Sequence, residues 1–159
     1  MKKGIFVMMA SLLMTNSFAQ SEKYLKAMEG LVPAVDTTRS MEGLTDLANA
    51  FERIANAEKT QWLPFYYAAL CNINIANSYF LLQQPEKIDP LMDKAEPMMN
   101  KAEALEKNNA EIMCLKKMSN SGKMMADTMN RFMIFGQAAS EALETAKSLN
   151  PATTSVYPL

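Results

Sequence analysis

The segment GQAASEALETAKSLNP, residues 136–151, gives the clearest indication of the fold class of this chain. Within it, Ala139, Leu143 and Ala146 follow one another at spacings of four and three residues, and Pro151 comes five residues later. Residues three and four apart share one face of an α-helix, whereas proline disrupts a helix beyond its first turn. The segment therefore predicts a helix with a small–large–small apolar stripe that ends just before Pro151.

The same small–large–small spacing occurs twice upstream. The two copies are Ala95, Met99 and Ala102, and Ala50, Ile54 and Ala57. The three copies begin at residues 50, 95 and 139, which gives a period of 44 to 45 residues. A fixed period in this range is typical of proteins built from stacked helix pairs.

The N-terminal segment MKKGIFVMMASLLMTNSFAQ has the pattern of a secretory signal peptide. Two lysines precede an apolar run from Ile5 to Met14, and small residues stand at Ser17 and Ala19. A membrane anchor is the alternative, but the run is short for a hydrocarbon layer of about 30 Å. We therefore expect cleavage near Ala19, a single domain at 20–159, and a periplasmic or secreted protein without membrane insertion.

Composition argues against several classes of function. The net charge is −1, with 16 basic and 17 acidic residues and no basic run, so we expect no nucleic-acid partner. Histidine, the commonest general base and metal ligand, is absent from the whole sequence. Phosphate-binding glycine loops and the Gly-x-Ser-x-Gly nucleophile motif are also missing. The sequence therefore predicts no enzyme, no cofactor and no metal site.

Helical periodicity is the only regular pattern in the rest of the chain, so we expect an all-α fold. The apolar stripes and breaks place helices at about residues 22–32, 40–58, 62–82, 89–107, 110–126 and 127–149. We expect Pro33 to end the first helix and Pro97 to kink the fourth. Thr60, Asp89 and Asp127 are the predicted N-caps of the third, fourth and sixth helices.

The third of these helices contains WLPFYYAAL, residues 62–70, and is apolar over most of its surface. Such a helix is expected at the centre of the fold. Short connections make neighbouring helices antiparallel, which predicts helix pairs at about 22–58, 62–107 and 110–149. One pair cannot bury its own apolar face, so the three pairs are expected to stack.

These residues resemble the tetratricopeptide (TPR) repeat, whose second helix carries small, large and small residues and a proline at the same offsets. Ala139, Leu143, Ala146 and Pro151 match all four positions, although the period exceeds the family's repeat of about 34 residues. The stretches WLPFYYAALCNI, KAEALEKNNAEI and LNPATTSVY also resemble secreted TPR-like proteins of Bacteroidetes. The resemblance implies three antiparallel helix pairs in a short right-handed α-solenoid, which acts as a non-catalytic scaffold for an unknown protein or peptide.

Amides along the third helix are the candidate partner-binding residues. Tyr67 and Asn74 are seven residues apart on one helix face, and Asn77 continues the polar side. Amides beside a tyrosine can bond the backbone of an extended peptide. The alternative is an ordinary solvated helix face.

Methionine and cysteine leave further alternatives open. Met98-Met99, Met124-Met125, Met129 and Met133 are either core filler, an adaptable exposed surface or, with less support, a soft copper(I) site. Cys71 and Cys114 either form a disulfide after export or remain as buried thiols.

Two other functions compete with the scaffold interpretation. The chain is alternatively a structural subunit whose aromatic and methionine-rich faces are buried in a homo-oligomer or envelope assembly. The remote alternative is a small enzyme that uses a pair among the scattered surface carboxylates, none of which the sequence distinguishes.

Overall fold

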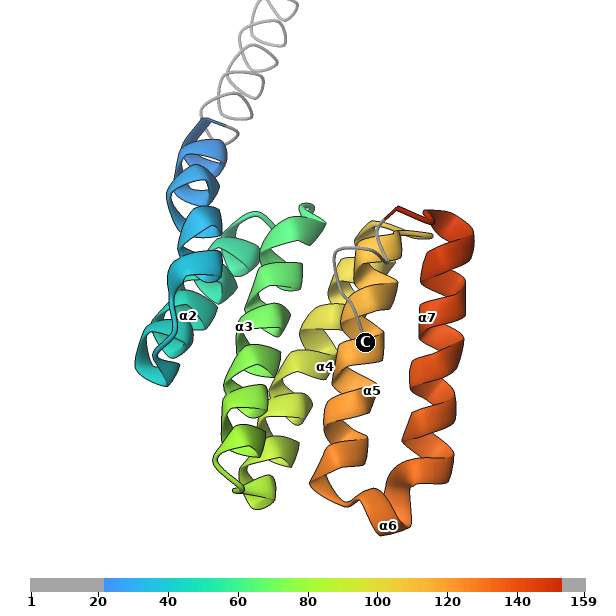
Figure 1. Cartoon of the computed structure of the whole chain (residues 1–159). Helices are drawn as coiled ribbons and strands as arrows, with labels where there is room; N and C mark the ends of the chain where they lie inside the picture. The colour runs from blue at the N-terminus through green and yellow to red at the C-terminus, as the bar shows by residue number, and fades with distance from the viewer. Residues whose placement is uncertain (1–21, 153–159) are drawn as a thin grey trace, which may run out of the picture.

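The computed structural model describes residues 22–152 (Figure 1). The predicted signal peptide at 1–19 and its cleavage near Ala19 lie outside these residues. Within the described range the chain is almost entirely helical and has no strand, so the all-α prediction is confirmed. No helix in this range is long and apolar enough to cross a bilayer.

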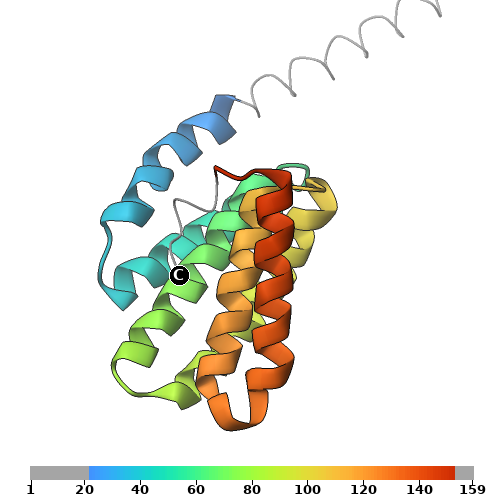
Figure 2. The same cartoon turned by 45° about the vertical axis from the view of Figure 1, so that its right-hand side comes forward.

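The helices follow one another in space in nearly the same order as in the chain (Figure 1). Residues 22–37 are helical, and the further elements are α2 (Met41–Ala57), α3 (Trp62–Leu81), the 3-10 turn η1 (Pro85–Lys87), α4 (Ile88–Leu105), α5 (Ala110–Ala126), α6 (Thr128–Arg131), the π-helical turn η2 (Phe132–Gly136) and α7 (Gln137–Leu149). Helix α3 contacts α2, α4 and α5, which confirms its predicted central position. Helices α5 and α7 lie side by side, joined by α6 and η2 (Figures 1 and 2).

The hydrophobic core forms two clusters that share α3. One cluster joins residues 22–37, α2 and one face of α3, and Phe51 is its largest fully buried side chain. The other joins the opposite face of α3 to α4 and α5, through Ile73, Met92 and Ile112 among others. Burying apolar area on both faces makes α3 the element that holds the two ends of the fold together.

The small–large–small stripe is buried in two of its three copies. Ala95, Met99 and Ala102 are buried on α4, and on α7 Ala139 and Ala146 are buried while Leu143 is half-buried. The prediction is wrong for α2, where Ala50 and Ile54 are half-buried and Ala57 is exposed. Helix α2 instead turns its Phe51 face inward, because burying an aromatic ring removes more apolar area from water than burying an alanine.

Several predicted helix ends differ from the structure. The first helix continues through Pro33 to residue 37. Proline has no amide hydrogen to donate to the carbonyl of Glu29, but Pro33 and Glu29 are both exposed on the helix surface. Val35, beyond the proline, is buried and extends the apolar stripe of the helix. Thr60 does not cap α3, whose N-cap is Gln61 without a side-chain hydrogen bond. Asp89 lies inside the first turn of α4, which starts one residue earlier after η1, and its carboxylate binds Arg131 instead of capping the helix.

Other predicted helix ends agree with the structure. The Asn108–Asn109 turn precedes α5, and the Asn109 side chain accepts hydrogen bonds from the amides of Glu111 and Ile112. Asp127 accepts a hydrogen bond from the amide of Asn130 and so caps the segment that begins at Thr128. These caps satisfy amides that have no partner within their own helix.

Helices α4 and α5 approach each other closely at Gly122. An added Cβ at this position would overlap Met92 Cε and lie 3.3 Å from Met92 Sδ. The Ser119 hydroxyl, one turn earlier, donates to the same sulfur at 3.6 Å. The small residues that weaken the helical propensity of α5 therefore form the surface on which Met92 packs.

We expect Gly122→Ala to lower the free energy of unfolding by about 1 kcal/mol, because the fully buried end of the Met92 side chain must shift to make room for the added methyl group. Gly30→Ala is the matched control, since an added Cβ there meets nothing within 4 Å. This control should raise stability by up to about 1 kcal/mol through helix propensity. Urea unfolding followed by circular dichroism measures both changes, and equal stabilisation by the two substitutions would contradict the close contact.

Candidate functional site

An apolar pocket opens between α5, η2 and α7. Its volume is about 530 Å³, within the range of small-molecule and cofactor sites. We call it the α5–α7 pocket. Its lining residues are Lys117, Ser121, Met124, Phe132, Met133, Gly136, Gln137, Ala139, Ser140 and Leu143.

Large apolar side chains at this end of the molecule are exposed to solvent. Phe132 is 58% exposed and Met133 is 77% exposed, and both line the α5–α7 pocket. Met129 and Ile134, beside them in the chain, are exposed as well. A cluster of exposed apolar side chains is unfavourable in water and marks a binding surface more often than a scattered single residue does.

The pocket owes its shape to an irregular turn between α5 and α7. Asp127 starts α6, which is only one turn long, and the backbone then widens into the π-helical turn η2 at FMIFG. Such turns are rare and occur frequently at functional sites. Gly136 ends η2 without a side chain, and a Cβ there would lie 3.4 Å from Met124 Sδ. The thioether of Met124 and the backbone of Gly136 are therefore adjacent in the pocket.

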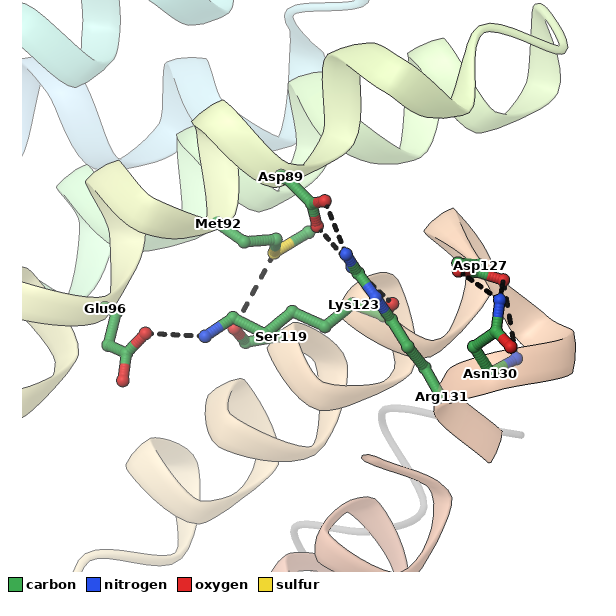
Figure 3. A network of polar contacts seen from close by, with 8 residues as sticks. All are labelled: Asp89, Met92, Glu96, Ser119, Lys123, Asp127, Asn130 and Arg131. Carbon is green, nitrogen blue, oxygen red and sulfur yellow. Dashed lines mark hydrogen bonds and ion pairs between the residues drawn. The ribbon is translucent and has the colours of Figure 1, made fainter. Parts of the chain in front are cut away.

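A network of polar contacts ties this turn to α4 (Figure 3). Arg131 Nη1 and Nη2 donate to the two Asp89 carboxylate oxygens at 2.6 and 2.9 Å, and Nη1 also donates to the Lys123 carbonyl at 3.3 Å. Lys123 Nζ pairs with Glu96 at 2.5 Å and lies 5.8 Å from the centre of the Phe135 ring. The bidentate geometry of the arginine fixes the direction of the short helix α6 and hence the position of η2.

Lys117 is the only charged residue among those lining the α5–α7 pocket. No ion pair in residues 22–152 involves Lys117, whereas Lys116, the residue before it, pairs with Glu103. A lone cation at the edge of an apolar site favours a ligand that combines an apolar body with an anionic group.

The predicted partner-binding residues lie on α3, away from the α5–α7 pocket. Tyr67 is half-buried, and its ring stacks on Phe51 with centroids 5.1 Å apart. Asn74 and Asn77 are also half-buried, and the Asn74 carbonyl accepts a hydrogen bond from Ser78. Tyr67 therefore contributes to packing between α2 and α3, while a binding role for the three residues stays a prediction.

A second, more polar depression lies where α2, α3 and α4 meet. Its volume is about 440 Å³, and its lining residues are Thr45, Ala48, Asn49, Glu52, Asn72, Ile75, Leu91, Asp93, Lys94, Pro97 and Met98. We call it the α2–α4 groove. Asn72 of α3 is buried at its base and donates to the Ala68 carbonyl at 2.9 Å. Tyr67, Asn74 and Asn77 are not among its lining residues.

The methionines divide between core and surface. Met92 and Met99 are buried on α4, whereas Met129 and Met133 are exposed and Met124 is half-buried. The surface interpretation therefore holds for the C-terminal members of the methionine-rich segments, and the core interpretation for the others. This abundance was the only sequence signal for the α5–α7 pocket, because Phe132 and Leu143 have ordinary helical spacing.

Both cysteines are buried free thiols in the structure. Burial raises the pKa of the Cys71 thiol to about 12, and burial together with the nearby Glu111 carboxylate raises the pKa of Cys114. The thiols therefore stay protonated at neutral pH, which makes them poor nucleophiles and poor metal ligands. Groups of three or more His, Cys, Asp or Glu side chains that could hold a metal ion do not occur in residues 22–152.

Comparison with solved structures finds a similar protein, the HusA haemophore from Porphyromonas gingivalis. The TM-score is 0.71 with 35% sequence identity, and the match covers 81% of this chain and 61% of HusA. This chain thus spans about three fifths of the length of HusA. Scans against family models and curated proteins find no match.

This similarity bears on two of the expectations from the sequence. HusA comes from a member of the Bacteroidetes, the group that the aromatic and Asn-Pro stretches resemble. A haemophore is a binding protein and not an enzyme, in agreement with the prediction that this chain is not an enzyme.

Thiol labelling tests the state of the cysteines. In the native protein we expect slow reaction of both thiols with iodoacetamide, because they are buried and protonated. After unfolding in guanidinium without a reductant, both should react. Failure to react in the unfolded state would indicate a disulfide between Cys71 and Cys114.

Replacing Asp89 tests the tie between α4 and α6. The Arg131 hydrogen bond, with the Arg131 charge, holds the pKa of Asp89 below its ordinary value of about 3.9. The pair therefore stabilises the fold above about pH 4, and this contribution is lost as the pH falls through the lowered pKa. We expect Asp89→Asn to lower the urea midpoint at pH 7, with a difference from wild type that vanishes on acidification below about pH 4.

The exposed residue Asp46 on α2 provides the control for that experiment. Asp46→Asn removes the same charge without removing an ion pair. A midpoint for Asp89→Asn equal to that of Asp46→Asn at pH 7 would show that the Arg131 pair does not hold α6 in place.

Proposed function

We propose that this protein is an exported, non-catalytic binding protein whose ligand is haem, bound in the α5–α7 pocket. The observation that carries the proposal is the combination of exposed apolar side chains, Phe132 and Met133, with a single cation, Lys117, around one open pocket. The similarity to a haemophore at 35% identity supports the choice of ligand.

The residues of the pocket fit the chemistry of haem. The porphyrin is a flat apolar ring, and its burial would remove Phe132 and Leu143 from water, at roughly 25 cal/mol per Å² of apolar area. The propionate carboxylates of haem are anionic and would lie near Lys117. Carboxylates are absent from the lining of the pocket, so no like charge opposes them.

The fold is proposed to be a short TPR-like solenoid of three antiparallel helix pairs at about 22–58, 62–107 and 110–149. Packing of residues 22–37 on α2, of α3 on α4 and of α5 on α7 supports this division. The contact of α3 with α5 supports stacking of successive pairs through their first helices. Export through the signal peptide at 1–19 belongs to the same proposal.

A second candidate function is the binding of a protein or peptide on the α2–α3–α4 side of the molecule. The α2–α4 groove supports it, because polar and charged side chains such as Glu52, Asp93 and Lys94 surround the buried amide of Asn72. Tyr67, Asn74 and Asn77 are the proposed contacts on the rest of α3. The apolar character of the α5–α7 pocket makes haem the better-supported ligand.

Haem titration of the chain without its signal peptide tests the first proposal. We expect saturable binding with a shifted Soret absorbance. Phe132→Ser should weaken binding by at least about tenfold, since it removes the aromatic side chain among the lining residues.

Leu81→Ser is the matched control for that titration. Leu81 is 80% exposed at the end of α3 and does not line the α5–α7 pocket, so its substitution should leave the affinity unchanged. Equal affinities for Phe132→Ser and the wild type would place the ligand elsewhere, and absence of saturable binding would overturn the proposed function.

A further inference from the structure

The methionines of this fold differ widely in their access to solvent. Met92 is fully buried between α4 and α5, and Met28 and Met99 are buried in the two core clusters. Met129 and Met133, by contrast, are 96% and 77% exposed. An oxidant must touch the sulfur of a thioether to oxidise it, so an oxidant dissolved in water distinguishes these two groups.

Met133 is the one methionine of residues 22–152 that is both exposed and part of the α5–α7 pocket. Met124 also lines the pocket, but it is half-buried and its sulfur is adjacent to Gly136. Met129 is more exposed than Met133 but does not line the pocket. A chemical change that is confined to exposed thioethers therefore reaches the pocket through Met133.

The oxidation of a thioether by a hydroperoxide is a simple transfer of one oxygen atom. The sulfur attacks one oxygen of the peroxide, so that an S–O bond forms and the O–O bond breaks. The sulfur loses two electrons and becomes a sulfoxide. The peroxide gains these electrons, and the second oxygen takes up the proton of the transferred one and leaves as water.

We propose that Met133 is a reversible oxidation site, at which a hydroperoxide forms methionine sulfoxide and thereby weakens the binding of an apolar ligand in the α5–α7 pocket. The effect on binding rests on the proposed function and adds a form of regulation to the same site. The oxidation itself depends only on the exposure of the side chain. Methionine sulfoxide reductases, one for each sulfur epimer, act on exposed side chains and would restore the thioether.

Sulfoxide at Met133 changes the pocket without changing the core. The S–O group is polar, so covering it with an apolar ligand costs free energy unless a hydrogen bond replaces its water. The methionines that hold the helices together, such as Met92 and Met99, are buried and should keep their thioethers while the protein stays folded. Oxidation should therefore lower affinity while leaving the fold intact.

Tryptic peptides of the chain report the oxidation of single sites. Peptide 132–147, FMIFGQAASEALETAK, contains only Met133, and peptide 88–94, IDPLMDK, contains only the buried Met92. The folded, ligand-free protein is treated with hydrogen peroxide, quenched and digested. We expect peptide 132–147 to gain one oxygen at least about ten times faster than peptide 88–94, because only its methionine is accessible.

Two variants connect the oxidation with binding. Met133→Leu removes the proposed site, and Met129→Leu removes an exposed methionine outside the pocket as the matched control. Both changes keep apolar volume and usually disturb folding little. In Met129→Leu, peptide 124–131 retains only the half-buried Met124 and Met125, so its oxidation should be slower than that of peptide 132–147.

Haem affinity is then measured after the peroxide has been removed. Treatment should weaken haem binding at least about fivefold in the wild type and in Met129→Leu, as expected for a polar group placed in an apolar contact. It should leave the affinity of Met133→Leu unchanged. Reductase treatment should restore the wild-type affinity, and the thermal unfolding midpoint should stay the same throughout.

The outcomes separate this inference from the proposed function. Equal oxidation rates of peptides 132–147 and 88–94 in the folded protein would overturn Met133 as a selective site. Unchanged haem affinity after full oxidation of peptide 132–147, or an equal loss of affinity in Met133→Leu, would overturn its control of binding and leave haem binding itself standing. Absence of saturable haem binding before oxidation would overturn the proposed function and the control of binding with it.

Discussion

The close contact between Met92 of α4 and Gly122 of α5 is the constraint on which the C-terminal half of the structure depends. Because Gly122 has no side chain, the methionine occupies the space where a Cβ would stand, and the two helices approach closely. The same approach places Glu96 and Asp89 of α4 within reach of Lys123 and Arg131 (Figure 3). A bulkier residue at position 122 would displace the end of the Met92 side chain from this contact.

The α5–α7 pocket follows from that tie. Arg131 is held by Asp89, so the chain turns back over only a few residues before α7 packs against α5. The π-helical turn in this short connection directs Phe132 and Met133 outward and leaves the space beside Met124 and Gly136 open. Among the described residues, folding thus leaves Phe132 and Met133 exposed at one end of the molecule.

Sequence and structure agree where the signal is local. The Asp127 cap, the break at residues 108–109, the helical range of α5 and the central place of α3 follow from residue types that act on their immediate neighbours. Sequence and structure disagree where a residue contacts another residue that is far away in the chain. Asp89 has the local pattern of a helix cap, but its carboxylate accepts hydrogen bonds from Arg131, 42 residues later in the chain. Pro33 has the pattern of a helix end, but Val35, two residues later, is buried in the same core cluster as Phe51 of α2.

The candidate site shows the same division between local and distant information. The abundance of methionine was visible in the sequence, and so was the possibility that part of it forms a surface. Which methionines are exposed was not visible, because Met99 and Met133 each follow a large apolar residue and only packing distinguishes them. The amides of α3 looked like a polar face in the sequence, yet Tyr67 beside them stacks on Phe51.

The all-helical class, most helix positions and the absence of histidine ligands could be predicted from the sequence, because periodicity and composition are properties of the chain alone. The three-dimensional arrangement was needed to show that both cysteines remain free, and that Lys117, Met124 and Phe132 line one pocket. The physical reason is that burial and ion pairing depend on residues brought together across the fold, and their energies compete with local preferences of similar size.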